Sequence, residues 1–366
     1  LAAGTLGAAV SAFAQTTLKF SHTDQPGGAR QKAAELFAQK VEQYTQGRYK
    51  VQIFPAGQLA NDPKAVEQLQ LGGIDFTVTG TGTYATHIPT LNLTALPFIV
   101  ESYPQGWKLY DESKWMQAQF AKGPEKGFRF LSPFEAGFRS MTTKEPLATP
   151  ADAKGKKLRS FPNEMMRWQL EAMGFNVQIM PLPEVYLAIQ QGAVSGQENP
   201  IDTIHANKFY EVAPNVTLTQ HVYSPIPMTI SEKTWQKLSP ADQSAVQKAA
   251  REASDWSRKE VSGNDERLLA EMTAKGAKVA RPDIGPWRDA VQPVYAKARE
   301  KYGNDVDRVD RFARRWGDRY AGLVEEMRRS GGEVSLETRR GLAAEGFAHT
   351  SGYEIAIQAY LAGGAG

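Results

Sequence analysis

The feature that most constrains the fold is a regular alternation of strand-like and helix-like segments near the N-terminus. Residues 17–21, 49–54 and 74–79 have strand character, and residues 28–44 and 62–71 between them carry apolar side chains at helical spacing. Short connections between strand, helix, strand, helix and strand favour a parallel arrangement. The beginning of the chain therefore predicts a parallel sheet flanked by helices.

The middle of the chain repeats this theme with different turns. The sequence Ser239-Pro240 opens a helix that is expected to run past Met272, because serine caps helices and proline suits the first turn. A helix of that length is long enough to span two lobes. Further strands are expected at 128–134, 138–143, 156–160, 176–180, 195–198, 216–223 and 228–231, and further helices at 163–173 and 183–191.

At 366 residues the chain exceeds what one ordinary core accommodates. We therefore predict an α/β fold of two lobes: mixed sheets flanked by helices, a long lobe-spanning helix and an extra helical C-terminal tail. Repeated crossings between lobes give a hinge, and the cleft beside it is the usual place for a small ligand. The expected parts are lobe I (15–136 and 224–263), lobe II (137–223 and 264–304) and a C-terminal helical extension (305–366).

The N-terminus is typical of an exported protein. Residues 1–10 are small and apolar, and Ala12 and Ala14 form an A-x-A arrangement. This pattern predicts that residues 1–14 are the remnant of a signal peptide, cleaved after Ala14 to leave Gln15 first. No later stretch approaches the roughly 18 apolar residues of a membrane span. The mature protein is therefore expected to be exported.

Composition removes several classes of function. The chain has no cysteine, which excludes thiolate zinc sites, iron–sulfur clusters, a cysteine nucleophile and disulfides. None of the five histidines falls in an HExxH pattern, and neither GxSxG nor GxxxxGK[ST] occurs. The net charge of +3 is spread along the chain, so nucleic-acid binding is not expected. We predict no catalytic residue, no metal and no cofactor.

One string imitates a dinucleotide site. The segment 80–85 reads GxGxxA after an expected strand, with Glu101 at a suitable distance. A dinucleotide site needs that string to open a long helix. Because Pro89 and Pro97 interrupt the segment, we predict a tight turn at the rim of the cleft instead.

Two arginines stand out in the expected second lobe. Arg139 and Arg159 lie in strand-like segments among turn or apolar residues, away from charged helical faces. An arbitrary arginine is usually a surface or ion-paired residue. A guanidinium, however, also offers a planar fork of donors that grips a carboxylate through two parallel hydrogen bonds.

A long segment decides between these roles. Residues 184–200, EVYLAIQQGAVSGQENP, closely resemble the signature of the solute-binding proteins of TRAP (tripartite ATP-independent periplasmic) transporters, the dicarboxylate-binding receptor family. Segments 18–22, 54–59, 96–98, 209–212 and 218–221 match the same family in order. The resemblance covers roughly residues 17 to 302. It implies a two-lobed periplasmic binding protein fold and a location in the periplasm.

The resemblance implies a binding site for a small organic carboxylate. In this family the ligand carboxylate is held chiefly by the arginine that matches Arg159. A second arginine, which matches Arg139, and an asparagine, which matches Asn199, assist it. Two fixed cations and an amide are thus expected around the anion. Further contacts are implied for residues in the surrounding loops, namely His22, Thr23, Thr79, Gly80, Gln220 and His221. Phe161, next to Arg159, either lines the site or packs in the core.

Three positions depart from the family pattern. Ser195 stands where an aspartate is common, which leaves the ligand site intact. Thr79-Gly80 offers no acid where sugar-acid-binding members carry a glutamate, and Leu182 replaces an aromatic residue. A small, partly apolar carboxylate is therefore expected rather than a polyhydroxylated ligand.

The implied function is a receptor that closes on a carboxylate and delivers it to membrane permease subunits. Two alternatives remain: an enzyme that converts an organic acid on the same scaffold, and a ligand sensor for a signalling partner. In the tail, Val309, Phe312 and Trp316 begin an apolar stripe beside several arginines. That stripe suits a helix that packs on its own lobe or one exchanged with a second subunit in a homodimer.

Overall fold

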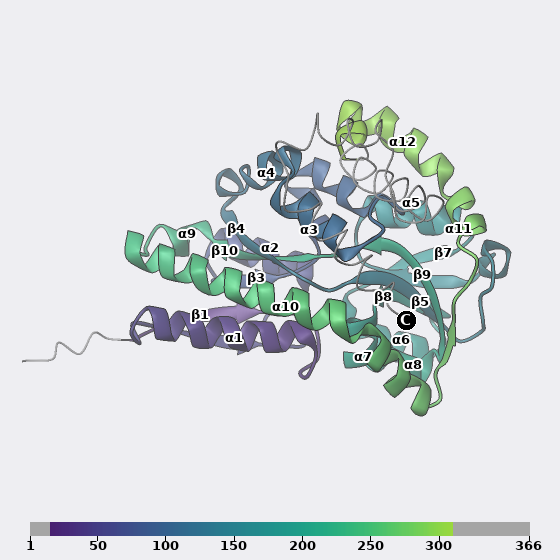
Figure 1. The fold of residues 1–366 in the computed structure, drawn as a ribbon, viewed down its shortest axis with the longest axis horizontal. Helices are drawn as coiled ribbons and strands as arrows, with labels where there is room; N and C mark the ends of the chain where they lie inside the picture. The colour runs from purple at the N-terminus through teal and green to yellow at the C-terminus, as the bar shows by residue number, and fades with distance from the viewer. Residues whose placement is uncertain (1–14, 310–366) are drawn as a thin grey trace, which may run out of the picture.

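The computed structural model describes residues 15–309, which form two β-sheets flanked by helices (Figure 1). The five-stranded sheet has the order β2-β1-β3-β10-β4, and the six-stranded sheet has the order β11-β9-β5-β8-β6-β7. The strands are β1 (Thr16–Ser21), β2 (Tyr49–Phe54), β3 (Phe76–Val78), β4 (Phe128–Phe134), β5 (Phe138–Thr143), β6 (Lys157–Ser160), β7 (Asn176–Ile179), β8 (Gly196–Pro200), β9 (Asn215–Tyr223), β10 (Ile226–Ser231) and β11 (Lys278–Ala280).

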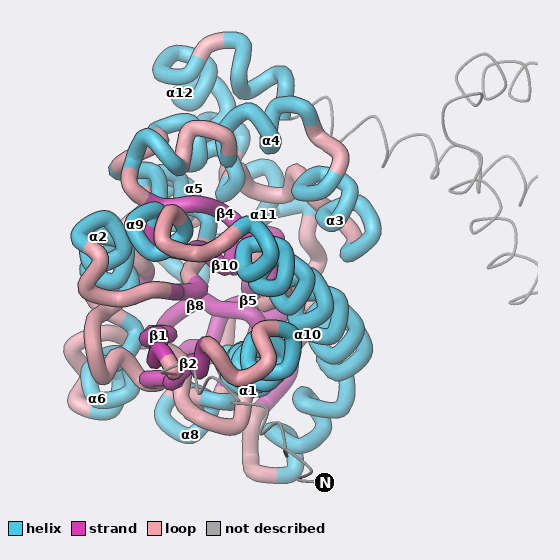
Figure 2. Tube along the Cα trace, turned by 90° about the vertical axis from the view of Figure 1, so that its left-hand side faces the viewer, coloured by secondary structure: helices cyan, strands magenta, loops and turns pink. Residues whose placement is uncertain are grey.

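Twelve α-helices within this range cover the sheets (Figure 2). They are α1 (Ala29–Tyr44), α2 (Asp62–Leu71), α3 (Tyr103–Asp111), α4 (Lys114–Phe120), α5 (Glu164–Ala172), α6 (Val185–Gln190), α7 (Ile201–Ala206), α8 (Phe209–Val212), α9 (Glu232–Trp235), α10 (Pro240–Ala274), α11 (Gly285–Ala290) and α12 (Gln292–Tyr302).

Local capping explains where the predicted helices begin and end. The side chain of Asn61 accepts a hydrogen bond from Lys64 N at 3.1 Å at the start of α2, and Gly72 ends that helix in the left-handed region with φ of 78°. Ser239 caps α10 in the same way, accepting from Asp242 N at 3.1 Å. Both helices therefore follow from short sequence signals.

The five-stranded sheet is mixed. Strand β1 pairs in parallel with β2 and β3, as the alternating pattern predicted, whereas β10 runs antiparallel to β3 and β4. Its core joins Phe20 and Phe76 of the sheet to Phe37 of α1 and to Val246 and Ala250 of α10. The last two residues lie in the N-terminal half of the long helix.

The six-stranded sheet is also mixed, since β5 is antiparallel to β8 and β9 while β6 is parallel to β7 and β8. A separate core lies around α6, α7 and α8. Leu268, Leu269 and Met272, in the C-terminal half of α10, belong to this second core. The predicted two-lobed α/β fold with mixed sheets and a lobe-spanning helix is confirmed (Figure 1).

The chain passes between the two sheets at the connections β4–β5 and β9–β10. Glu135, buried in the first connection, accepts hydrogen bonds from Trp107 Nε1 at 2.9 Å and from Tyr223 Oη at 2.7 Å. Glu135 N in turn donates to Ser257 Oγ of α10 at 3.1 Å. These bonds hold the crossing segments together. We propose that the lobe boundaries lie after residues 136 and 223.

Some predictions fall outside the described range. The signal-peptide remnant 1–14 and the tail from residue 310 onward, including Phe312 and Trp316, lie there. The GxGxxA string forms only the short 3₁₀ helix η1 (Thr81–Thr86), in agreement with the predicted turn. Within residues 15–309 no helix has the length and apolar character required to cross a bilayer.

Candidate functional site

A cavity lies between the two sheets, and its space is about 420 Å³ when the open solvent at its mouth is included. One wall comes from the five-stranded sheet and its loops, and the other comes from β5, β6, β8 and the segments that follow them. The lining residues include Arg30, Asp62, Thr79, Gly80, Arg139, Arg159, Phe161, Leu182, Asn199 and Ser224.

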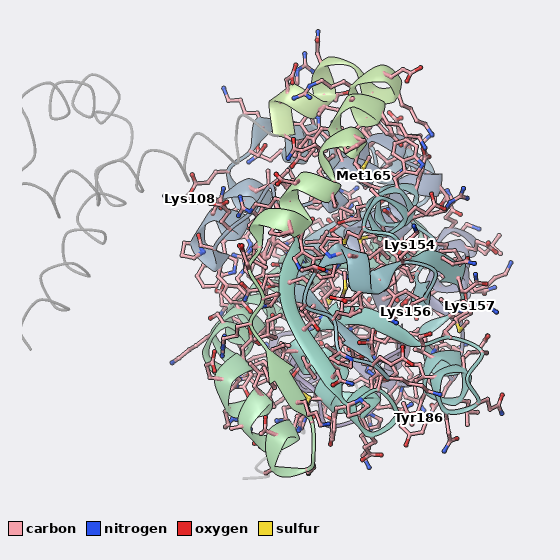
Figure 3. All side chains as sticks on the ribbon, turned by 90° about the vertical axis from the view of Figure 1, so that its right-hand side faces the viewer. Lys108, Lys154, Lys156, Lys157, Met165 and Tyr186 are labelled. Carbon is pink, nitrogen blue, oxygen red and sulfur yellow. The ribbon has the colours of Figure 1, made fainter. Side chains whose placement is uncertain are left out.

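Arg159 is the charged centre of this cavity. It lies in β6, whose neighbouring Lys157 is exposed and points to the outside (Figure 3), whereas Arg159 is only 2% exposed. Its Nε and Nη2 donate to the carbonyl oxygen of Met180 at 2.9 and 2.8 Å. No carboxylate in residues 15–309 forms an ion pair with it.

Burial lowers the pKa of Arg159 to about 10, with Glu198 acting in the opposite direction. The guanidinium therefore remains protonated at neutral pH. It is a buried cation whose charge is not neutralised by direct pairing, which is a costly arrangement in a folded protein. An anion entering the cavity would remove that cost.

Arg139 has a different environment, in which its charge is balanced within the protein. Its guanidinium forms an ion pair with the buried carboxylate of Glu198, and its Nη2 also donates to Glu198 O at 2.7 Å and to Asn199 Oδ1 at 3.0 Å. Nη1 donates to Ser224 Oγ at 3.2 Å, and the group lies 5.0 Å from the ring centre of Phe161. The physical reason is that two like charges buried together repel, so one of them is neutralised within the protein.

Glu198 is fully buried and held from three sides. Besides Arg139, it accepts from Ser160 Oγ at 2.9 Å, and His221 Nε2 lies 3.5 Å from its second oxygen. Burial opposes ionisation, but the charge of Arg139 and the hydrogen bonds from Arg139 and His221 outweigh it and hold the pKa of Glu198 at about 2. The carboxylate is charged under all ordinary conditions.

The opposite wall carries two groups that the sequence did not single out as site residues. Arg30 is paired with Asp24, with 2.9 Å between Nε and Oδ2. Asp62 Oδ1 accepts from Thr23 Oγ1 at 2.9 Å, and burial raises the pKa of its carboxyl while the charge of Arg30 opposes that rise. Asp62 is the first residue of α2, but Asn61 caps that helix and leaves the Asp62 carboxyl to face the cavity.

Six of the ten predicted site residues line the cavity: Arg159, Arg139, Asn199, Phe161, Thr79 and Gly80. The other four do not. Thr23 is not among the lining residues, but its hydroxyl donates a hydrogen bond to the Asp62 carboxylate. His22 is buried, bonded to Gln31 Oε1 at 2.7 Å, and burial lowers its pKa to about 4, so the ring is neutral.

The two remaining predicted residues lie further from the ligand space. Gln220 is exposed, with its backbone in the left-handed region at φ of 46°. His221 is buried behind Glu198 and bonded to Thr219 through Nδ1 at 2.8 Å. Neither residue is among those that line the cavity.

The pairing pattern leaves one cation and one acid facing the cavity. Arg30 and Arg139 are neutralised by Asp24 and Glu198, so Arg159 and Asp62 remain as the groups without a partner of opposite charge among residues 15–309. Such a cavity suits a molecule with a carboxylate at one end and a hydrogen-bond donor at the other. Across the same residues, no group of three or more His, Asp or Glu side chains is arranged to hold a metal ion.

Comparisons with known proteins agree with this geometry. The family model described as bacterial extracellular solute-binding protein, family 7, matches residues 20–301. A second model, described as AICARFT/IMPCHase bienzyme, matches residues 317–365, a short segment outside the described range that shows no membership.

Relatives match over nearly their whole length. The sialic acid-binding periplasmic protein SiaP of Vibrio cholerae serotype O1 is 33% identical over 303 residues, which cover 82% of this chain and 94% of that protein.

Two solved structures of TRAP periplasmic solute-binding proteins superpose with a TM-score of 0.78. One, from Polaromonas sp. JS666 bound to D-erythronate, is 33% identical and covers 82% of this chain and 98% of that chain. The other, from Sulfitobacter sp. NAS-14.1 with bound β-D-galacturonate, is 31% identical, with coverages of 81% and 99%. The chain therefore belongs to family 7 of the bacterial extracellular solute-binding proteins, which are receptors of TRAP transporters rather than enzymes.

Proposed function

We propose that this protein captures a small hydroxylated carboxylate between its lobes in the periplasm and delivers it to the membrane permease of a TRAP transporter. The observation that carries the proposal is the buried guanidinium of Arg159, which has no carboxylate partner within residues 15–309. A ligand carboxylate supplies the missing charge and accepts hydrogen bonds from the donor fork.

The remaining polar groups orient the ligand. Asn199 is fixed by its contact with Arg139 Nη2, and Ser224 is fixed by the contact with Nη1. We propose that Arg139 positions these neighbours and adds a weaker attraction for the anion, since Glu198 offsets most of its charge. Because groups from both sheets line the cavity, a bound ligand favours the closed arrangement of the lobes.

The proposed ligand class follows from Asp62. Its carboxyl is an acceptor on the wall opposite Arg139 and Arg159. A ligand hydroxyl that donates to this carboxyl would therefore be recognised. The relatives with D-erythronate and β-D-galacturonate hold hydroxylated acids of this kind. Phe161 and Leu182 give the cavity apolar wall area as well, but because of the acceptor at Asp62 we propose a hydroxylated acid instead of the partly apolar ligand expected from the sequence.

A panel of organic acids tests the function. We expect D-erythronate or a similar short hydroxy acid to raise the melting temperature of the purified protein, because a ligand that binds only the folded state stabilises it. Butyrate, a four-carbon acid without hydroxyl groups, is expected to give a smaller shift. If no carboxylate in a broad panel shifts the melting temperature or gives heat in calorimetry, the proposed function is wrong.

Replacement of Asp62 by alanine is expected to change selectivity. A hydrogen bond contributes about 0.5–3 kcal/mol, with the upper part of the range for a charged acceptor, so hydroxy acids should bind roughly twofold to a hundredfold more weakly. Acids without hydroxyl groups should bind as they do to the wild type. Calorimetric titration of both classes measures the difference, and equal losses for both would remove Asp62 from ligand recognition.

The homodimer predicted through the C-terminal tail concerns residues beyond the described range. We propose it still as one of two roles for the apolar stripe that begins at Val309. Light scattering on the purified protein with its tail intact decides, because a mass of one chain rules the dimer out.

A further inference from the structure

A second contact region joins the two lobes outside the ligand cavity. Helix α1 begins at Ala29, and its preceding residue Gly28 provides no side-chain cap. Instead, the backbone N–H of Ala29 donates to both carboxylate oxygens of Asp202 in α7, at 3.0 and 3.2 Å. Helix α1 packs on the five-stranded sheet and α7 belongs to the core beside the six-stranded sheet, so this cap crosses from one lobe to the other. In Figure 1 the right-hand end of α1 lies beside α7.

The contact is tight as well as polar. A Cβ atom at Gly28 would lie 3.0 Å from Cβ of Ala206 and 3.1 Å from Oδ1 of Asp202. Gly28 has φ of −77°, which any residue adopts. Glycine is therefore needed here for the close approach of α7 rather than for backbone freedom. A second hydrogen bond, from Asn207 Nδ2 to Asp24 Oδ1 at 3.4 Å, joins the lobes at the same place.

We propose that this contact, formed by Asp24, Gly28 and Ala29 on one lobe and Asp202, Ala206 and Asn207 on the other, is a proton-sensitive latch that holds the closed conformation. The inference rests on the proposed function, since closure around a ligand is the step that the latch stabilises. None of Gly28, Asp202 and Ala206 lines the cavity, so the latch acts on closure and not on ligand contacts.

Proton sensitivity follows from the charges that closure brings together. Asp202 faces Asp24 and Arg30 from the first lobe and Asp265 from α10, and Asp265 accepts from Tyr103 Oη of α3 at 3.0 Å. Burial, helped by Asp24 and Asp265, raises the pKa of Asp202 to about 6, although the bond from Ala29 and the charge of Arg30 oppose that rise.

The direction of the pH effect follows from this shift. An Asp202 carboxyl exposed to water in an open form has the ordinary pKa near 3.8, so the closed form binds a proton more readily between about pH 4 and pH 6. Acidification within that window therefore favours closure. A neutral side chain that keeps the acceptor oxygen should imitate the protonated state.

Three variants test the latch. Gly28→Ala inserts a methyl group into the interlobe contact and is expected to weaken ligand affinity roughly tenfold, mainly through faster release. Asp202→Asn keeps an acceptor for Ala29 without the charge. The wild type should gain roughly tenfold in affinity between pH 7.5 and pH 5.0, and Asp202→Asn should bind at pH 7.5 at least as tightly as the wild type does at pH 5.0. Asp152→Asn is the matched control, because Asp152 also accepts two backbone hydrogen bonds, at 2.8 and 3.0 Å, but within one loop.

Lobe closure is measured directly by fluorescence energy transfer. The chain has no cysteine, so Gln39→Cys on α1 and Leu187→Cys on α6, both exposed positions, take dyes at defined places. We expect Gly28→Ala to shift the population towards the open form while its unfolding midpoint without ligand stays near that of the wild type. Wild-type affinity and lobe distance in Gly28→Ala would overturn the latch.

The pH dependence of closure is tested separately. Equal pH dependence of closure in the wild type and in Asp202→Asn would overturn the proton sensitivity. If no carboxylate binds the wild type, the proposed function fails, but the unliganded lobe distance at pH 7.5 and 5.0 still tests the latch. In that case a wild-type shift towards the closed form on acidification, lost in Asp202→Asn, supports it, and no shift overturns it.

Discussion

Replacement of Arg159 by alanine is expected to abolish measurable carboxylate binding while the protein remains folded. Arg159 is 2% exposed and has no carboxylate partner within residues 15–309, so we propose a ligand anion as its counter-charge. Removing one member of a buried, hydrogen-bonded charge pair costs about 2–5 kcal/mol, which is roughly thirtyfold to several thousandfold in affinity. Calorimetric titration with the best ligand of the panel measures the loss.

Two further variants sharpen this result. Arg159→Lys should recover only part of the affinity, because an ammonium group cannot form two parallel bonds to one carboxylate. Arg167→Ala is the control, since Arg167 lies nearby on α5 but is 59% exposed and pairs with Glu171. Its affinity should equal that of the wild type. Retention of full binding by Arg159→Ala would remove Arg159 from the site.

Replacement of Arg139 by methionine is expected to act on stability rather than mainly on binding. The change leaves the fully buried Glu198 without its counter-charge, and breaking a buried pair in this way costs about 3–5 kcal/mol. Arg159→Ala removes an unpaired cation and should leave the free energy of unfolding unchanged or higher. Urea denaturation of both variants measures the contrast, and equal destabilisation would contradict the different pairing of the two arginines.

The pH dependence of the Arg139 variant has a definite sign. In the wild type the pKa of Glu198 is depressed to about 2 from an ordinary 4.5, so its stabilising contribution is present above pH 4.5 and is lost as the pH falls towards 2. Without Arg139, burial dominates and the pKa rises above 4.5. Arg139→Met should therefore regain stability relative to the wild type between pH 7 and pH 5. The double variant Arg139→Met/Glu198→Gln should regain the lost stability at every pH, because neither replaced residue then leaves a buried charge without a partner.

Local signals in the sequence were sufficient for the parts of the fold that depend on neighbours along the chain. The cap and proline of α10, the bounds of α2 and the strands β4 and β5 follow from residues in or beside each element. The antiparallel pairing of β10 between β3 and β4 does not, because it joins segments about 100 or more residues apart. The short helices α7, α8 and α9 lack a full helical period of apolar residues and were not predicted.

The candidate site also has parts that the sequence predicts and parts that require coordinates. Arg159, Arg139 and Asn199 were found through a long family signature, yet only coordinates distinguish the neutralised Arg139 from the unpaired Arg159. Asp62 was missed because an acid at a helix start already has a sufficient local explanation. Gln220 and His221 were included because the segment lies near the cleft, but side-chain direction in β9 was not deducible from spacing.

The central claim is that Arg159 is the counter-charge of the ligand carboxylate. A crystal structure of the protein with its tightest-binding acid tests it most directly. The account predicts a ligand carboxylate within hydrogen-bond distance of the Arg159 guanidinium, with Glu198 still paired to Arg139. A ligand whose carboxylate lies on Arg30 or outside the cavity, with Arg159 still bonded only to Met180, would contradict it.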